Sequence, residues 1–420
     1  MKYHLIGNLG VSMQAIAEIL KSRGDKVTGS DLKTSGHGAK NITKDIDFVI
    51  RSSAVSPGSA GWIEVEEAER LKIKVLKRSE FLGELTAGKY LIAISGMHGK
   101  TTVTALIGLA LIEAGLDPTV LVGEKLLEFN NSAVREGKSK YFVLEACEYD
   151  RSFLDLTPNV AVITNIDLEH LDTYPGGMKE IKKTFVEFLA KIKKGGALVA
   201  YSQDKNLKQV AALVRPDIKK IFYGEADHVG ADYPSALIGQ HNRQNAEAVF
   251  ALADYLKIDK KHVLEVLKNF KGAKRRLEYK GNFDQTPVFD DYGHHPTEIA
   301  TTIKALKEKF PERKIIAVFW PHQFKRILPL KDEFVAALSM ADEIVLKPIF
   351  FVPGRDEKLD VSSEDIALAL NKINKKSRVF KQDSEIVDYL KRQNRDGLVI
   401  LTIGIPPIYK VAELLLKEGT

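Results

Sequence analysis

The hydrophobic and polar positions of the chain follow two periods that alternate along its length. Short apolar runs such as Tyr3–Ile6 and Val160–Thr164 have the length and branched side chains of buried strands, and a turn follows each. Longer segments repeat their apolar residues at helical spacing, as at Ala15, Ile16 and Ile19. This alternation predicts an α/β protein in which parallel sheets are covered by helices.

Three blocks of this alternation follow one another, and 420 residues are enough for two or three domains. We predict domains at 1–88, 89–272 and 273–420, the first and last Rossmann-like. The further strands are expected at 27–29, 48–51, 72–76, 91–94, 141–144, 197–201, 287–289, 314–319, 343–346 and 398–403. The further helices are expected at 102–114, 178–193, 242–256, 296–310, 328–340, 364–373 and from 408 onward. Residues 224–240 are rich in Gly, Asp and Ala and are predicted to form a loop.

The most informative segment joins a strand to a helix through the sequence Ser-Gly-Met-His-Gly-Lys-Thr-Thr at 95–102. Glycines at 96 and 99 allow backbone N–H groups to approach an anion, and the helix start adds partial positive charge. Lys100 can neutralise phosphate oxygens, and the Thr101 hydroxyl can reach a Mg²⁺ ion. A glycine turn with a surface lysine is the alternative. The order of strand, loop and helix favours a phosphate site.

Polar side chains follow the next two strands of this second block. They are Glu145, Glu148 and Asp150 after one strand, and Asn165, Asp167, Glu169, His170 and Asp172 after the other. Ligands of open α/β sheets bind at such strand ends. Hydroxyl, carboxylate and imidazole groups beside a phosphate loop can hold Mg²⁺, although this ion generally prefers oxygen ligands. A solvated loop acid and a helix-capping or core histidine are the alternatives for Glu148 and His170.

The third block has two polar loops after neighbouring strands. One reads Phe-Asp-Asp-Tyr-Gly-His-His-Pro-Thr-Glu at 289–298, where the proline begins a helix. The other reads Trp-Pro-His-Gln-Phe-Lys-Arg at 320–326. Both loops are predicted to face the same edge of the sheet, where their cationic and hydrogen-bonding groups can hold a carboxylate and phosphates.

The first block offers a turn at Gly7–Ser12 with Asp31 downstream. By itself this is a weak dinucleotide fingerprint, because it lacks the initial G-x-G, and a plain strand-to-helix turn explains it equally well.

Composition narrows the class of protein. Hydrophobic residues make up 44% and charged residues 28%, as in ordinary globular proteins, and the net charge of +6 comes from interspersed charges. We therefore predict no binding of nucleic acid. The chain has too few consecutive apolar residues for a membrane span, and its one cysteine, Cys147, excludes an intrachain disulfide. A cytoplasmic protein is expected.

Six motifs, taken together and in order, resemble those of the Mur ligase family over essentially the whole chain. The loop at 95–102 is similar to G-T-H-G-K-T-T, with Met97 in place of a threonine, and 145–150 is similar to E-A-D-E-S-D. The remaining four are Asn-x-x-x-Glu-His at 165–170, Gly-Gln-His-Asn-Arg-Gln-Asn-Ala at 239–246, the hinge at 272–277, and Asp-Asp-Tyr-Gly-His-His-Pro-Thr-Glu at 290–298.

The resemblance implies site residues position by position. ATP would be bound by Gly96, Met97, His98, Gly99, Lys100, Thr101, Thr102, His241, Asn242, Asn245 and Arg276, with Lys100 on the β- and γ-phosphates. Mg²⁺ would be coordinated by Thr101, Glu148 and His170. Substrates would be bound by Asp31, Ser52, Ser53, Tyr292, His294, His322 and Arg326, with the first three at a uridine group. Lys100, Asp291, His294 and Arg326 would carry catalysis, and either His294 or Asp291 would accept the proton of the amine.

The resemblance also implies a reaction, in which ATP activates a carboxylate as an acyl phosphate for attack by an amine. The complete match at 290–298 favours the member that joins L-alanine to UDP-N-acetylmuramate in peptidoglycan precursor synthesis, acting as a monomer or homodimer. A murein peptide-recycling ligase, a nucleotide-binding relative with reduced catalysis, and a dinucleotide oxidoreductase are the alternatives. Departures from the family pattern stand at Leu9, Ser12, Gln323 and 405–407, and the stretch from 223 to 239 implies a shortened central domain.

Overall fold

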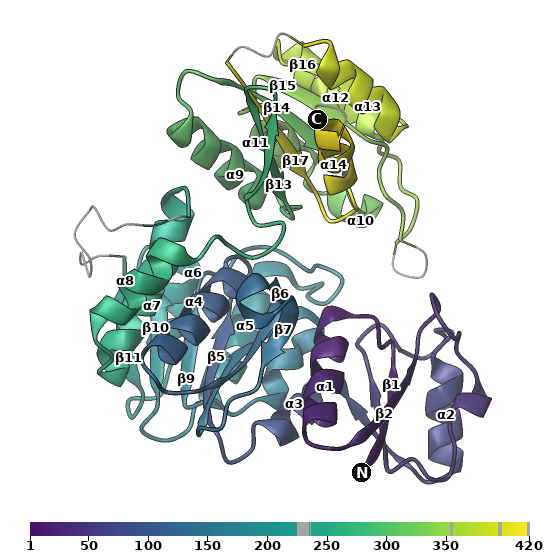
Figure 1. Cartoon of the computed structure of the whole chain (residues 1–420), viewed down its shortest axis with the longest axis vertical. Helices are drawn as coiled ribbons and strands as arrows, with labels where there is room; N and C mark the ends of the chain where they lie inside the picture. The colour runs from purple at the N-terminus through teal and green to yellow at the C-terminus, as the bar shows by residue number, and fades with distance from the viewer. Residues whose placement is uncertain (225–234, 236, 353–355, 394–396, 418–420) are drawn as a thin grey trace. The chain divides into compact units, whose positions relative to one another are not determined.

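The computed structural model describes residues 1–224, 235, 237–352, 356–393 and 397–417. The chain divides into two compact units, one formed by 1–235 with 243–273 and the other by 236–242 with 274–420. Three sheets carry the fold (Figure 1), so the predicted α/β class is confirmed. Most of the loop predicted at 224–240 lies outside the described residues.

The first sheet is parallel throughout, in the order β2-β1-β3-β4. Its strands are β1 (Lys2–Ile6), β2 (Lys26–Ser30), β3 (Phe48–Arg51) and β4 (Lys74–Lys77), and its helices are α1 (Val11–Ser22), η1 (Ala39–Asn41), α2 (Trp62–Arg70) and α3 (Arg78–Leu85). The strand predicted at 72–76 begins later, because Lys72 has a φ of 61° and lies in the preceding turn.

The second sheet has the order β11-β10-β9-β5-β8-β6-β7. Its strands are β5 (Tyr90–Ser95), β6 (Thr119–Leu126), β7 (Ser132–Arg135), β8 (Tyr141–Glu145), β9 (Val160–Ile163), β10 (Ala197–Tyr201) and β11 (Lys219–Tyr223). Its helices are α4 (Lys100–Glu113), η2 (Leu127–Phe129), η3 (Tyr149–Asp155), α5 (Gly177–Ala190), α6 (Lys205–Ala212), α7 (Gln240–Leu256) and α8 (Lys260–Asn269).

The third sheet has the order β12-β13-β17-β14-β15-β16. Its strands are β12 (Glu278–Phe283), β13 (Thr286–Asp291), β14 (Lys314–Phe319), β15 (Glu343–Leu346), β16 (Lys376–Val379) and β17 (Leu398–Ile403). Its helices are α9 (Pro296–Lys309), α10 (Phe324–Ile327), α11 (Lys331–Leu338), α12 (Ser363–Lys372), α13 (Asp383–Lys391) and α14 (Tyr409–Lys417).

Two predictions about these elements were wrong. The second and third sheets are not purely parallel, because β7 pairs antiparallel with β6 and β12 pairs antiparallel with β13. Short connections allow such hairpins, whereas a parallel pair needs a crossover. The helix predicted at 328–340 is shorter and corresponds to α11 alone, because Leu330, which precedes its first turn, has non-helical backbone angles.

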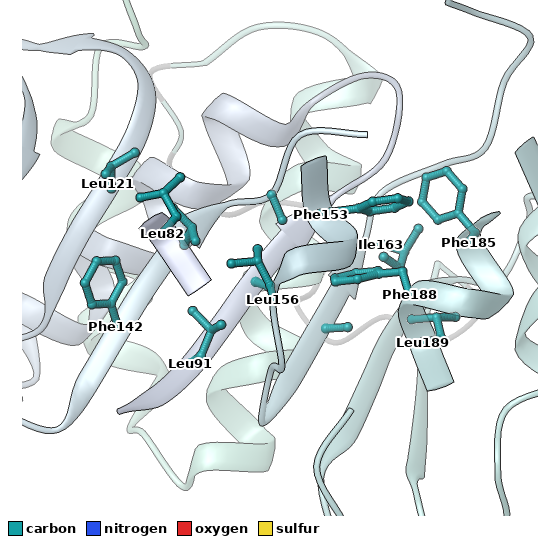
Figure 2. Close-up of a cluster of buried hydrophobic side chains, with 14 of the residues drawn as sticks. Leu82, Leu91, Leu121, Phe142, Phe153, Leu156, Ile163, Phe185, Phe188 and Leu189 are labelled. Carbon is teal, nitrogen blue, oxygen red and sulfur yellow. The ribbon is translucent and has the colours of Figure 1, made fainter. Parts of the chain in front are cut away.

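One continuous core joins the first two sheets within the first unit. Leu82 of α3 lies in the same buried cluster as Leu91, Leu121 and Phe142 of the second sheet (Figure 2). Phe153 stacks on Phe188 with ring centres 4.5 Å apart. Because close packing resists rearrangement, this shared core holds the two sheets together as one unit.

Candidate active site

The predicted phosphate loop follows β5 and is held by the neighbouring strand end. Asn165, just past β9, accepts hydrogen bonds with its Oδ1 from the N–H groups of Met97 at 3.1 Å and His98 at 2.9 Å. Its Nδ2 donates to the His98 carbonyl at 2.9 Å. One amide side chain therefore fixes the backbone of the two residues between Gly96 and Gly99. The sequence analysis placed Asn165 at this strand end but assigned it no role.

Lys100 begins α4 and is enclosed by its own loop. Its Nζ donates to the carbonyls of Gly96 at 2.6 Å and Met97 at 2.9 Å, and it lies 3.0 Å from the Glu148 carboxylate. Burial alone would lower the pKa of Lys100, because it disfavours the charged amine. The negative charge of Glu148 outweighs this effect and raises the pKa of Lys100 above its usual value. The ammonium is thus fully charged at neutral pH and stands at the start of a helix, where anions bind.

Glu148 lies at the centre of the predicted metal group. Its side chain is 1% exposed, and its Oε1 lies 3.1 Å from His170 Nε2. Burial favours the neutral acid, yet the Lys100 charge and the His170 hydrogen bond lower the pKa of Glu148 below its usual value. Burial alone would lower the pKa of His170, but the hydrogen bond with Glu148 and the Glu169 charge outweigh burial and raise that pKa above its usual value. The structure brings Lys100, Glu148 and His170 together as the sequence analysis expected.

Asn245 of α7 reaches the same loop. Gly99 has a left-handed backbone with a φ of 82°, and a Cβ at this position would lie 2.7 Å from Asn245 Oδ1. A side chain at position 99 would therefore displace Asn245 as well as strain the backbone. Beside the loop, His98 Nε2 also lies 3.1 Å from Asp167 Oδ2.

In the second unit, the Arg275 side chain holds the hinge at 272–277 in place through hydrogen bonds. Arg275 donates from Nε to Asp290 Oδ2 at 2.9 Å and from Nη1 to the Ile405 carbonyl at 3.0 Å. Its guanidinium lies 5.1 Å from the ring centre of Tyr292. The guanidinium therefore joins the polar loop after β13 to the replaced segment 405–407. The sequence did not predict this role of Arg275, because nothing in the pattern of residues distinguishes it from the adjacent Arg276.

Arg276 also lies over the Tyr292 ring, and it is close to the start of α9. Its guanidinium is 5.3 Å from that ring centre, and its Nη1 is 3.7 Å from Glu298 Oε1. Glu298 also accepts the N–H of His294 at 2.9 Å and lies 3.4 Å from His294 Nδ1. Tyr292, His294 and Arg276 therefore lie close together, a grouping that the sequence did not predict.

Asp291 is buried and holds two backbone groups. Its Oδ2 accepts the N–H of Leu277 at 2.7 Å, and its Oδ1 accepts the N–H of Gly293 at 2.7 Å. Burial, with a smaller effect of the Glu298 charge, raises the pKa of Asp291 to about 6. In the same unit, burial lowers the pKa of His241 to about 4, with the Arg276 charge adding to the effect. His241 therefore presents a neutral imidazole at neutral pH.

His322 lies in the loop after β14, and Arg326 lies in the short helix α10 that follows this loop. Arg326 Nη1 is 3.5 Å from His322 Nδ1, and the His322 ring stacks on Phe350. Between them Gln323 has φ 68° and ψ 122°, a conformation that costs a side-chain-bearing residue about 1–3 kcal/mol. Such strain is characteristic of functional loops, and it falls at a position where this chain departs from the family pattern.

The remaining predicted residues lie at the edge of the first sheet. Asp31 directly follows β2, and its Oδ1 accepts the N–H of Lys33 at 3.1 Å. Ser52 directly follows β3, and a Cβ at Gly7 would lie 2.6 Å from Ser52 Oγ. The turns after β1 and β3 are therefore in close contact, at the edge where open parallel sheets bind nucleotides.

Three family models match in chain order. They are described as Mur ligase family, catalytic domain, at residues 2–90, Mur ligase middle domain at 94–253, and Mur ligase, glutamate ligase domain, at 275–405. The chain belongs to the Mur ligase family.

Two curated relatives can be aligned with nearly the whole length of this Mur ligase. A UDP-N-acetylmuramate–L-alanine ligase of Clostridium acetobutylicum is 38% identical over 455 residues, covering 99% of this chain and 98% of the relative. The protein with the same description from Geobacter sulfurreducens is 37% identical over 460 residues, with coverage of 99% and 97%.

Solved structures share the same fold. The UDP-N-acetylmuramate-alanine ligase of Thermotoga maritima matches this Mur ligase with a TM-score of 0.79 and 24% identity, covering 100% of this chain and 99% of that one. A murein peptide ligase of Psychrobacter arcticus matches with a TM-score of 0.73 and 22% identity, covering 100% and 98%. No helix among the described residues combines the length and apolar character needed to cross a membrane.

Proposed function

We propose that this Mur ligase joins L-alanine to the carboxylate of UDP-N-acetylmuramate at the expense of ATP. The observation that carries the proposal is the enclosed Lys100 and its partner Glu148 in a chain 38% identical over its full length to a UDP-N-acetylmuramate–L-alanine ligase. The reaction would take place in the cytoplasm, and the boundaries near 88 and 272 would separate the sugar-nucleotide, ATP and amino-acid domains.

A carboxylate is a poor electrophile because its negative charge repels an incoming amine. In the proposed reaction a carboxylate oxygen of the sugar attacks the γ-phosphorus of ATP, and ADP leaves. Lys100 neutralises charge on the moving phosphoryl group, so that positioning and electrostatics provide the acceleration. The neutral amine of alanine then attacks the acyl carbon, an amide bond forms, and phosphate leaves with the bond electrons.

The groups near Glu148 fit a magnesium ion. Glu148 provides a buried, ionised carboxylate, and Thr101 provides a hydroxyl in the first turn of α4. We propose that these two residues and His170 would hold Mg²⁺, which supplies charge neutralisation at the phosphates when bound. His241, Asn242 and Asn245 would hold the adenine.

The two candidates for proton acceptance differ in their surroundings. Asp291 already accepts two backbone hydrogen bonds that support its loop, whereas His294 lies 3.4 Å from the Glu298 carboxylate, which can hold its imidazole in place. We therefore propose His294 as the acceptor of the amine proton and Asp291 as the support of the loop. His322 and Arg326 would bind the amino-acid carboxylate.

Phosphate release from ATP tests the proposal. Release should require UDP-N-acetylmuramate together with an amino acid, with L-alanine preferred over glycine, L-serine and a murein tripeptide. With ¹⁸O in the sugar carboxylate, one label should appear in the released phosphate, because the acyl phosphate forms through that oxygen. Preference for the tripeptide would identify a recycling ligase, and ATP binding without turnover would identify a protein with reduced catalysis.

A further inference from the structure

Glu64 of α2 is a buried acid outside the groups assigned above. Its neighbours on the helix, Val65 and Ala68, face the apolar core, and Glu64 itself is 0% exposed. A glutamate at an apolar helix position is costly unless its charge is fully compensated by hydrogen bonds. The position therefore calls for a role that an apolar residue could not perform.

The two oxygens of Glu64 bind two different parts of the first domain. Oε2 accepts from Ser30 Oγ at 2.6 Å, at the end of β2, and lies 3.1 Å from His4 Nε2 of β1. Oε1 accepts from the Gly38 N–H at 3.0 Å and from Asn41 Nδ2 at 2.7 Å. One carboxylate thus ties the sheet end to the segment that returns from it.

This arrangement requires two acceptor oxygens. Burial alone would favour the neutral acid, but the hydrogen bonds from His4, Ser30, Asn41 and Gly38 lower the pKa of Glu64 to about 2. A glutamine in the same place would offer one oxygen and turn its NH₂ group toward donors, leaving buried donors without an acceptor.

The segment held in this way begins with a predicted substrate residue. Asp31 follows Ser30 directly, and its carbonyl accepts the N–H groups of Thr34 at 3.0 Å and Gly36 at 3.1 Å. Asn41 also donates to the Gly36 carbonyl at 3.1 Å. The orientation of Asp31 is therefore fixed at both ends of the segment by groups that bind Glu64.

We propose that Glu64 is a positioning residue that fixes segment 31–41 for binding of UDP-N-acetylmuramate and takes no part in phosphoryl transfer. The inference rests on the proposed function, because Asp31 is predicted to bind the uridine group of the substrate named there. If the segment is ordered for binding only a tenth of the time without Glu64, the apparent affinity for the nucleotide sugar falls about tenfold.

Steady-state kinetics of Glu64→Gln test the proposal. We expect the KM for UDP-N-acetylmuramate to rise about tenfold, while kcat and the KM for ATP stay within about twofold. Glu66→Gln, an exposed glutamate on the same helix, is the matched control and should leave all three constants unchanged. Hydrogen exchange in the ligand-free protein should show faster exchange of the amides of 31–41 in Glu64→Gln alone.

A milder variant covers the case in which Glu64→Gln does not fold. Asn41→Ala removes one donor and keeps the carboxylate, and should raise the same KM about threefold. An unchanged KM despite faster exchange, or a fall in kcat with an unchanged KM, would overturn the proposal. Calorimetric titration with UDP-N-acetylmuramate separates the two hypotheses, because a wild-type protein that binds the sugar but forms no amide refutes only the proposed function.

Discussion

Two buried glutamates of the first unit show how the partners of a charge reveal its role. Glu64 is 0% exposed and Glu148 is 1% exposed, and the pKa of each lies below its usual value. Glu64 is held by hydrogen-bond donors fixed within one domain. Glu148 is held by Lys100 and His170. A phosphate group would also attract the Lys100 ammonium, and a metal ion would also attract the His170 imidazole. We therefore expect the first arrangement to be permanent and the second to be exchangeable for contacts to a ligand.

Asp291 of the second unit extends the comparison, because it is also buried but its pKa is raised to about 6. It accepts two backbone N–H groups, whereas Glu64 has four donors within hydrogen-bond distance. The balance between burial and the number of donors therefore decides the direction of the shift.

Removal of Lys100 tests the exchangeable arrangement and should have the largest effect. Lys100→Met leaves the transferring phosphoryl group without its cation, and we expect kcat to fall by about a thousandfold or more. Lys183→Met is the control, because the Lys183 side chain is 78% exposed on α5. Both variants are compared by phosphate release under saturating substrates. Retention of more than about a tenth of the activity in Lys100→Met would refute the role of the lysine.

Glu148→Gln tests the comparison directly against Glu64→Gln. Loss of the Glu148 charge removes the partner of Lys100 and the predicted metal ligand, so kcat should fall about a hundredfold and more Mg²⁺ should be needed for half-maximal rate. Glu64→Gln should change only the KM for the sugar. For both variants, initial rates of phosphate release are measured while Mg²⁺ and each substrate are titrated in turn. If both variants changed the same kinetic constants, the proposed distinction between Glu64 and Glu148 would be refuted.

Arg275→Lys tests whether a charged group can also belong to a permanent arrangement. The Arg275 guanidinium binds the buried Asp290 carboxylate and the carbonyls of Gly404 and Ile405, a forked geometry that an ammonium cannot reproduce. We expect the free energy of unfolding to fall by about 3 kcal/mol, measured by urea titration. Arg276→Lys, which lacks this network, should be much closer to wild type in stability while raising the KM for ATP.

Much of the fold could be predicted from the sequence because apolar runs specify the interior of each sheet. The strands at 48–51, 197–201, 314–319, 343–346 and 398–403 have their predicted bounds. The antiparallel edge strands were missed, since Ser132–Arg135 is short and half of it is partly exposed. Strands of this kind are defined by pairing with a neighbour, and a hydrophobic pattern does not carry that information.

The site could be predicted only where a motif carries it. Lys100 was predicted from the phosphate-loop motif, and Glu148 and His170 from the resemblance to the family. The structure places these three residues in contact. Asn165, Arg275 and Glu64 act through hydrogen bonds to backbone or to residues distant in sequence. Such contacts depend on tertiary structure, so neither spacing nor composition identifies them.

The pH dependence of stability provides the finest test of the permanent arrangement. The folded pKa of Glu64, about 2, lies below its ordinary value of 4.5. Glu64 therefore stabilises the folded protein fully above pH 4.5, and this contribution is lost as the pH falls toward 2. The difference in unfolding free energy between wild type and Glu64→Gln should narrow by about 2 kcal/mol between pH 5 and pH 3. Other carboxylates titrate in both proteins and cancel in the difference, so a gap that stays constant would mean that Glu64 is not held as an ion by its donors.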